Sequence, residues 1–195
     1  MTLTKCHALI IAPAVLALGA CAVVTSERQP AQEAPSPAAS EPRFLPTVSD
    51  PDCCYLPSDP APLGYRVPVG GALLVGVVEA IRPANGLVLT ANSSNPSPPP
   101  GFEYLLVRVS LQCTTAPNAP CDLSMGVQFL AQDLSGTTYD AATNLAGIPR
   151  PFDLSGVAEG AIAEGNLVYL VPTAAEGLTV AFTWPNMAGV SLAIE

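Results

Sequence analysis

Apolar and polar side chains alternate most clearly between residues 102 and 112. The two faces of this segment are Leu105, Val107, Val109 and Leu111, and Tyr104, Leu106, Arg108, Ser110 and Gln112. Successive side chains of a strand point to opposite sides of a sheet, so the alternation predicts a half-buried strand with its first face in the core.

Shorter apolar or β-branched runs accompany this strand along the chain. They lie at 71–81, 86–90, 126–131, 137–141, 167–171, 178–184 and 190–194. Turn signals separate them, notably Asp-Leu-Ser at 122–124, 133–135 and 153–155. Many short strands at close intervals predict an all-β sandwich or barrel, and no amphipathic helix stands out after the N-terminus.

The first twenty residues are organised like a secretory signal peptide. Lys5 precedes an apolar run over residues 8–18, which ends in Leu18-Gly19-Ala20-Cys21. This ending resembles the lipobox of bacterial lipoproteins. The resemblance implies cleavage between Ala20 and Cys21 and attachment of lipid, including acyl groups such as palmitate, to Cys21. A plain signal peptide with an incidental cysteine, or an uncleaved signal anchor, is the alternative.

A proline-rich segment follows the lipobox. Residues 22–62 hold nine prolines among Ala, Ser, Glu and Gln, a composition that cannot bury enough apolar surface to order itself. We therefore expect three parts: a signal peptide at 1–20, a disordered tether at 21–62 and a β-sandwich at 63–195. The mature protein would be exported and anchored to a membrane of the bacterial cell envelope, the outer membrane in a diderm cell.

The charge of the chain narrows the choice of partners. Seven basic and sixteen acidic residues give a formal net charge of -9, which excludes an electrostatic nucleic-acid binder. Only 12% of the residues are charged, against about 25% in ordinary soluble domains. A surface so poor in charge favours a partner that covers part of it, either an envelope protein or a wall component.

Several catalytic chemistries are missing from the expected mature chain. The single histidine, His7, and the single lysine, Lys5, both lie in the signal peptide, so histidine-dependent triads, imidazole-ligated zinc and lysine catalysis are excluded. Carboxylate pairs remain, namely Glu159 with Glu164 and Asp133 with Asp140, but in turn-rich segments these read as solvated charges. We expect no cofactor and no metal site.

Four cysteines would remain after processing and lipidation: Cys53, Cys54, Cys113 and Cys121. An even number in an exported protein suggests disulfides. Cys113 and Cys121 bracket a loop between two expected strands, which favours a bond between them. Cys53 and Cys54 would then form a vicinal disulfide or stay as thiols. Two bridges from Cys53 and Cys54 to the other pair are the alternative.

The strand region also resembles an immunoglobulin-like envelope domain found in bacterial lipoproteins, a family that includes a secreted mycobacterial immunoprotective antigen. The similar segments are 101–109, Phe129 to Asp133 with Gly136 and Tyr139, Glu159-Gly160 and 165–172. The resemblance covers about residues 65–195 and implies an immunoglobulin-like β-sandwich without enzymatic activity. Gln112-Cys113 stands where the family often has Asn at the end of its long strand.

These observations predict a lipid-anchored, non-enzymatic envelope protein whose sandwich binds a protein, a wall component or a small ligand. A structural subunit of an envelope complex and a carboxylate-dependent glycan hydrolase are the alternatives. The aromatic residues Phe102, Tyr104 and Trp184 could contact a ligand from the surface, but packing in the core or at an edge is the expected role.

Overall fold

The computed structural model describes residues 46–47, 55–114, 126–155, 160–184 and 189–195. These residues belong to one unit of the chain, Ser40–Glu195. The expected signal peptide, the cleavage site at Ala20 and Cys21, and most of the expected tether lie outside the described residues. Their assignments stay predictions.

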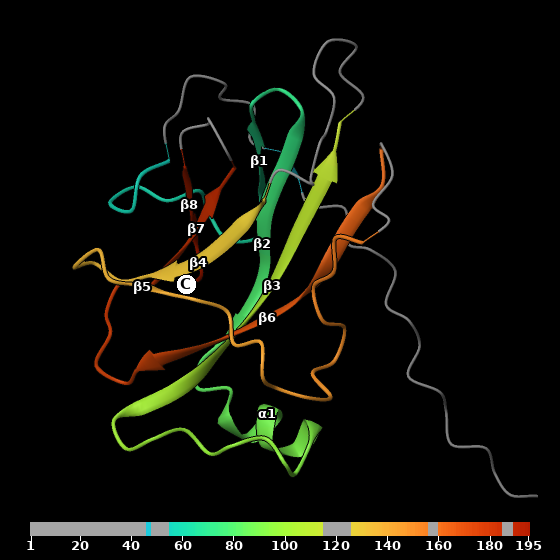
Figure 1. The fold of residues 1–195 in the computed structure, drawn as a ribbon. Coiled ribbons are helices and arrows are strands. Elements are labelled where there is room, and N and C mark those ends of the chain that lie inside the picture. Colours follow the sequence, from blue (N-terminus) through green and yellow to red (C-terminus); the bar gives the residue numbers. More distant parts are fainter. Residues whose placement is uncertain (1–45, 48–54, 115–125, 156–159, 185–188) are drawn as a thin grey trace, which may run out of the picture. The chain divides into compact units, whose positions relative to one another are not determined.

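In the described part of the chain, eight strands form two antiparallel sheets (Figure 1). The first sheet has the order β1-β2-β3-β6 and is built from β1 (Arg66–Val69), β2 (Leu73–Ile81), β3 (Phe102–Cys113) and β6 (Ile162–Pro172). The second has the order β5-β4-β7-β8 and is built from β4 (Gln128–Gln132), β5 (Thr138–Tyr139), β7 (Thr179–Thr183) and β8 (Val190–Ala193). The predicted all-β sandwich is confirmed, and the arrangement is consistent with an immunoglobulin-like fold.

The main core lies between the two sheets. The four apolar residues expected to face inward from β3 are fully buried, as the alternation predicted. Tyr169 of β6 and Phe182 of β7 are the largest fully buried side chains, and the Tyr169 hydroxyl donates a hydrogen bond of 3.2 Å to the carbonyl oxygen of Phe129 on β4. This bond links one sheet to the other through the core.

The outer face of β3 is more buried than a half-buried strand would be. Tyr104 is 4% exposed and Leu106 is 6% exposed. A second apolar cluster covers them, composed of Ala84, Val88, Tyr104, Leu106 and Val168. The expectation that this face meets solvent was therefore wrong at its N-terminal half, because residues from outside the sheet pack against it.

One helix, α1 (Asn85–Ala91), stands where the sequence predicted a strand at 86–90. The prediction was wrong because a five-residue apolar run does not distinguish a strand from a short helix. In the helix only Val88 is buried, and it packs in the second cluster. The Asn85 side chain accepts a hydrogen bond of 2.7 Å from the Tyr104 backbone, which fixes the helix beside the start of β3 (Figure 1).

The sandwich begins before the predicted boundary at residue 63. Ala61 is 1% exposed, its N–H donates to the Ser191 carbonyl at 2.8 Å, and its carbonyl accepts from Ala193 at 2.7 Å. Tyr55 also accepts a bond from Ser191, so this proline-rich segment pairs with the edge of β8. An edge strand has unpaired backbone groups, and a segment that satisfies them also protects the edge.

The β6 edge is covered in a similar way by residues 150–152. Asn166 donates its backbone N–H to the Arg150 carbonyl at 2.7 Å, and Phe152 donates to the Asn166 carbonyl at 3.0 Å. Gly165 permits this approach, because a Cβ atom there would lie 2.8 Å from the Pro151 carbonyl oxygen. β6 pairs with β3 from Ile162 to Pro172, and it is longer than the predicted strand at 167–171.

Within the described ranges, no helix is both long enough and apolar enough to cross a membrane.

Candidate binding groove

A groove of about 370 Å³ lies on the outer face of the first sheet. β2, β3 and β6 form part of its lining, α1 contributes three residues, and the segment between β5 and β6 contributes one. The lining residues are Glu79, Ile81, Leu87, Thr90, Ala91, Leu106, Arg108, Pro149 and Asn166. Most of them are apolar, and the charged members are Glu79 and Arg108.

Strand register brings the polar members of the groove together. Glu79, Arg108 and Asn166 are direct cross-strand partners on β2, β3 and β6. The register of β2 shifts between Val77 and Glu79, a β-bulge that leaves Val78 as an extra residue. Without the shift Val78 would stand opposite Arg108, since side-chain direction has a period of two residues. The bulge therefore places a carboxylate beside the arginine.

The Arg108 guanidinium is bonded through one nitrogen and keeps other donors without a partner among the described residues. Its Nη2 donates to Glu79 Oε2 at 2.8 Å, and its Nε lies 3.7 Å from Glu164 Oε1. Nε and Glu164 Oε2 are both buried without a hydrogen bond, and Arg108 Nη1 bonds to none of the described residues. A guanidinium has five donors, so Arg108 keeps hydrogen-bonding capacity for a ligand or water.

The wall of the groove opposite the strands is tied together by Asn95. This buried side chain donates to the carbonyls of Val88, at 2.8 Å, and Ala146, at 3.0 Å, and accepts from the Ala146 backbone at 2.8 Å. Asn166 donates to the Pro149 carbonyl at 2.6 Å. These bonds connect α1, the segment around residue 146 and β6, so the groove is preformed.

Two further hollows lie among the described residues. The first, of about 390 Å³, lies between β6 and residues 141–152 and shares Asn166 with the groove. Its lining is mostly apolar, with Thr143 and Asn166 as the polar side chains, and it contains no charged group. The second, of about 230 Å³, lies beside Asp133 and Glu176. Neither combines a charged hydrogen-bond donor with an apolar wall as the groove does.

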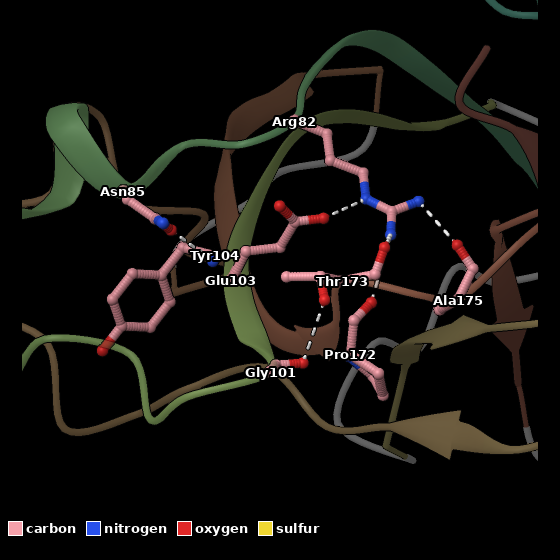
Figure 2. A network of polar contacts seen from close by, with 8 residues as sticks. All are labelled: Arg82, Asn85, Gly101, Glu103, Tyr104, Pro172, Thr173 and Ala175. Atoms are coloured by element: carbon pink, nitrogen blue, oxygen red, sulfur yellow. Dashed lines mark hydrogen bonds and ion pairs between the residues drawn. The ribbon is translucent and has the colours of Figure 1, made fainter.

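Arg82 forms four hydrogen bonds, and this network has a structural role (Figure 2). Its Nε bonds to Glu103 Oε1 at 2.6 Å, and its other nitrogens donate to the carbonyls of Pro172, Thr173 and Ala175. This arrangement ties the end of β2 to the start of β3 and to the chain after β6. Its donors are directed to protein acceptors, so the network offers little to a ligand.

The carboxylates singled out in the sequence have different surroundings. Glu164 lies beside Arg108, and its suggested partner Glu159 is outside the described residues. Asp133 accepts hydrogen bonds from Ser135, Thr137 and Tyr139, with distances of 2.6–3.0 Å. These contacts build a turn, as the Asp-Leu-Ser motif predicted, and they leave Asp133 no evident pairing with Asp140.

The second described Asp-Leu-Ser turn repeats this chemistry. Asp153 accepts from the Ser155 backbone at 2.8 Å and from the Ser155 hydroxyl at 2.6 Å. Hydrogen bonds from the serine side chain lower the pKa of both aspartates, with the Tyr139 hydroxyl adding to the effect on Asp133. Bonds to the charged form stabilise it, which is the cause of the lower pKa.

The Ser135→Ala substitution is expected to raise the pKa of Asp133 toward its ordinary value, because it removes the largest contribution to the lowering. The depressed pKa means that Asp133 stabilises the fold above the unfolded pKa, and that this contribution is lost as pH falls through the folded pKa. NMR titration of the Asp133 carboxyl carbon measures the pKa. Tyr139→Phe should give a smaller rise, and a wild-type pKa at or above the ordinary value would contradict the assignment.

Cys113 is disulfide-bonded and lies at the buried end of β3. Its partner is outside the described residues, as are Cys53, Cys54 and Cys121. The bond between Cys113 and Cys121 and the state of Cys53 and Cys54 therefore stay predictions. Across the described ranges, no cluster of three or more His, Cys, Asp or Glu residues could hold a metal ion.

The aromatic residues noted in the sequence divide between core and surface. Tyr104 is buried in the second cluster, and Trp184 packs partly buried against the main core. Phe102 is 41% exposed at the start of β3. The expectation of packing is thus correct for two of the three, and none of them lines the groove.

Most groove residues were missed by sequence reasoning. Arg108 was noted only as a member of the outer face of its strand, Asn166 only within the family-like segment 165–172, and Glu79 and Asn95 were not singled out. A weak signal existed, because Glu79 is the single charged residue between 71 and 81. Its significance depends on the bulge, which the sequence pattern does not reveal.

The fold defines a protein of the β-sandwich class. No protein-family model matches the chain, and no curated protein matches it. A search of solved structures finds a likeness to an uncharacterised β-sandwich protein from Clostridium difficile 630, with 9% sequence identity and a TM-score of 0.38. The match covers 70% of this chain and 95% of that one.

Proposed function

We propose that this is a lipid-anchored, non-enzymatic protein of the bacterial cell envelope whose β-sandwich binds a small ligand in the groove beside α1. The observation that carries the binding role is the groove itself, where apolar walls surround Arg108, whose Nη1 bonds to none of the described residues. Ligand sites are typically concave and mostly apolar, with a few polar groups that orient the ligand.

The anchor rests on the N-terminal sequence. Leu18-Gly19-Ala20-Cys21 resembles a lipobox, and the proline-rich segment after it would hold the sandwich away from the membrane. Two or more acyl chains on Cys21 give durable attachment, at about 0.8 kcal/mol for each buried CH₂ group.

The non-enzymatic role is supported by the chemistry that the residues offer. The histidine and the lysine of the chain both lie within residues 1–20. Asp133 is engaged in its turn, and Glu164 faces Arg108. Arg108 with its two carboxylate neighbours suits binding, because an arginine is always protonated and does not act as a general base.

Cys21→Ser is expected to release the protein from the membrane fraction, because serine cannot accept the thioether-linked lipid. Fractionation of cells followed by immunoblotting measures the distribution. Cys6→Ser is the matched control, since it removes a cysteine from the signal peptide without touching the lipobox, and it should leave the protein with the membranes. The anchor is refuted if the Cys21→Ser protein still partitions like the wild type.

A further inference from the structure

We infer that the ligand of the groove is a small uncharged amphiphile: an apolar body that carries one hydrogen-bond acceptor, such as a carbonyl or ether oxygen. The inference rests on the proposed binding role of the groove and specifies the chemistry of what it binds. Three features of the described residues support it, namely the apolar walls, the free donor and the balance of charge.

The apolar walls of the groove favour a ligand with an apolar body. Ile81 and Leu106 come from the sheet, while Leu87 of α1 lines the groove and is 49% exposed. Exposed large apolar side chains that border a preformed hollow gain free energy when a ligand removes them from water. The volume of about 370 Å³ is near the lower end of the roughly 300–1,000 Å³ typical of ligand pockets, which favours a small molecule.

The available donor on Arg108 favours a ligand that carries a hydrogen-bond acceptor. Glu79 fixes Arg108 through Nη2, while Nη1 bonds to none of the described residues. Because the salt bridge already orders the guanidinium, a ligand oxygen that bonds to it has little side-chain entropy to overcome.

The balance of charge disfavours a strongly charged ligand. Arg108 and Glu79 are the charged residues of the lining and they neutralise each other, while Glu164 adds a second carboxylate close to Arg108. An anion would have to compete with both carboxylates in a chain of net charge -9. A cation would find Glu79 already paired. An uncharged ligand bears neither cost.

Benzophenone is a suitable probe because it is uncharged, has two apolar rings and a carbonyl acceptor, and crosslinks to neighbouring C–H bonds under light. Full-length protein in native membranes would be irradiated with benzophenone or with benzophenone-4-carboxylate, which differs by one negative charge. Peptide mass spectrometry would locate the labels. We expect saturable labelling of the peptides that line the groove by benzophenone, and at least about tenfold less by the carboxylate.

Three variants separate the possible outcomes. Leu87→Asp should reduce groove labelling by benzophenone roughly tenfold, since it replaces an apolar wall with a charge. Leu134→Asp is the matched control, an exposed leucine outside the groove at 67% exposure, and it should change nothing. Glu79→Gln should increase labelling by the carboxylate, because it removes the competing charge.

The two proposals can fail separately. If the carboxylate labels the wild-type groove as well as benzophenone or better, in a manner that depends on Leu87, the uncharged ligand class is overturned and the binding role stands. If neither probe labels the groove, or if labelling is insensitive to Leu87→Asp, both the ligand class and the binding role are overturned.

Discussion

Tyr169→Ala is expected to lower the free energy of unfolding by about 3–5 kcal/mol, the range for removing a large aromatic side chain from a core. Tyr169 is 0% exposed and lies on β6 between the two sheets. Its removal leaves a cavity and also takes away the hydrogen bond to the Phe129 carbonyl on β4. Urea unfolding followed by circular dichroism measures the change.

Tyr169→Phe separates the hydroxyl from the ring. It keeps the packing and removes only the bond between the sheets, so a loss of about 1 kcal/mol is expected. Burial raises the pKa of the Tyr169 phenol, so the hydroxyl stays protonated and able to donate. Its contribution is present below the unfolded pKa of about 10 and is lost as pH rises beyond it. Equal losses for the two variants would contradict this division.

Asn95→Ala is expected to destabilise the protein by about 3 kcal/mol, because it leaves several buried backbone groups without partners at about 1–3 kcal/mol each. Asn95 makes three hydrogen bonds that join α1 to the segment around Ala146. The substitution should also loosen the groove, so that saturable labelling by benzophenone falls even under conditions where the variant is folded. Unfolding curves and the labelling assay measure the two effects.

Asn92→Ala is the matched control for Asn95. Asn92 lies three residues earlier, and among the described residues its side chain bonds only to Ser94, in an exposed turn. We expect it to cost less than about 1 kcal/mol and to leave labelling intact. If Asn95→Ala is no more damaging than Asn92→Ala, Asn95 does not organise the wall of the groove.

The inner face of β3 is a feature that the local sequence pattern predicted correctly. Leu105, Val107, Val109 and Leu111 alternate with larger or polar residues, and all four are fully buried. The turn at Asp133 is equally local, since its aspartate bonds to residues two to six positions later. The turn could be predicted because its interacting groups lie near one another in the chain. The buried face of β3 could be predicted because its apolar residues recur at every second position of one strand.

In the region around α1 the local sequence pattern predicted the wrong structure. The run at 86–90 has the composition of a strand, and it forms a helix because Val88 packs against residues of β3 and β6 that are distant in sequence. The proline-rich stretch before residue 63 has the composition of a tether. Its last residues nevertheless pair with β8 at the other end of the chain.

The sequence alone determined the class of fold, the aspartate turns, the absence of histidine from the described residues and the expectation of a lipid anchor at Cys21. Only the tertiary structure brought Glu79, Arg108 and Asn166 into one row and placed α1 beside them. The physical reason is that periodicity and turn chemistry act over a few residues. A groove depends on strand register, on one bulge and on contacts between segments far apart in the chain.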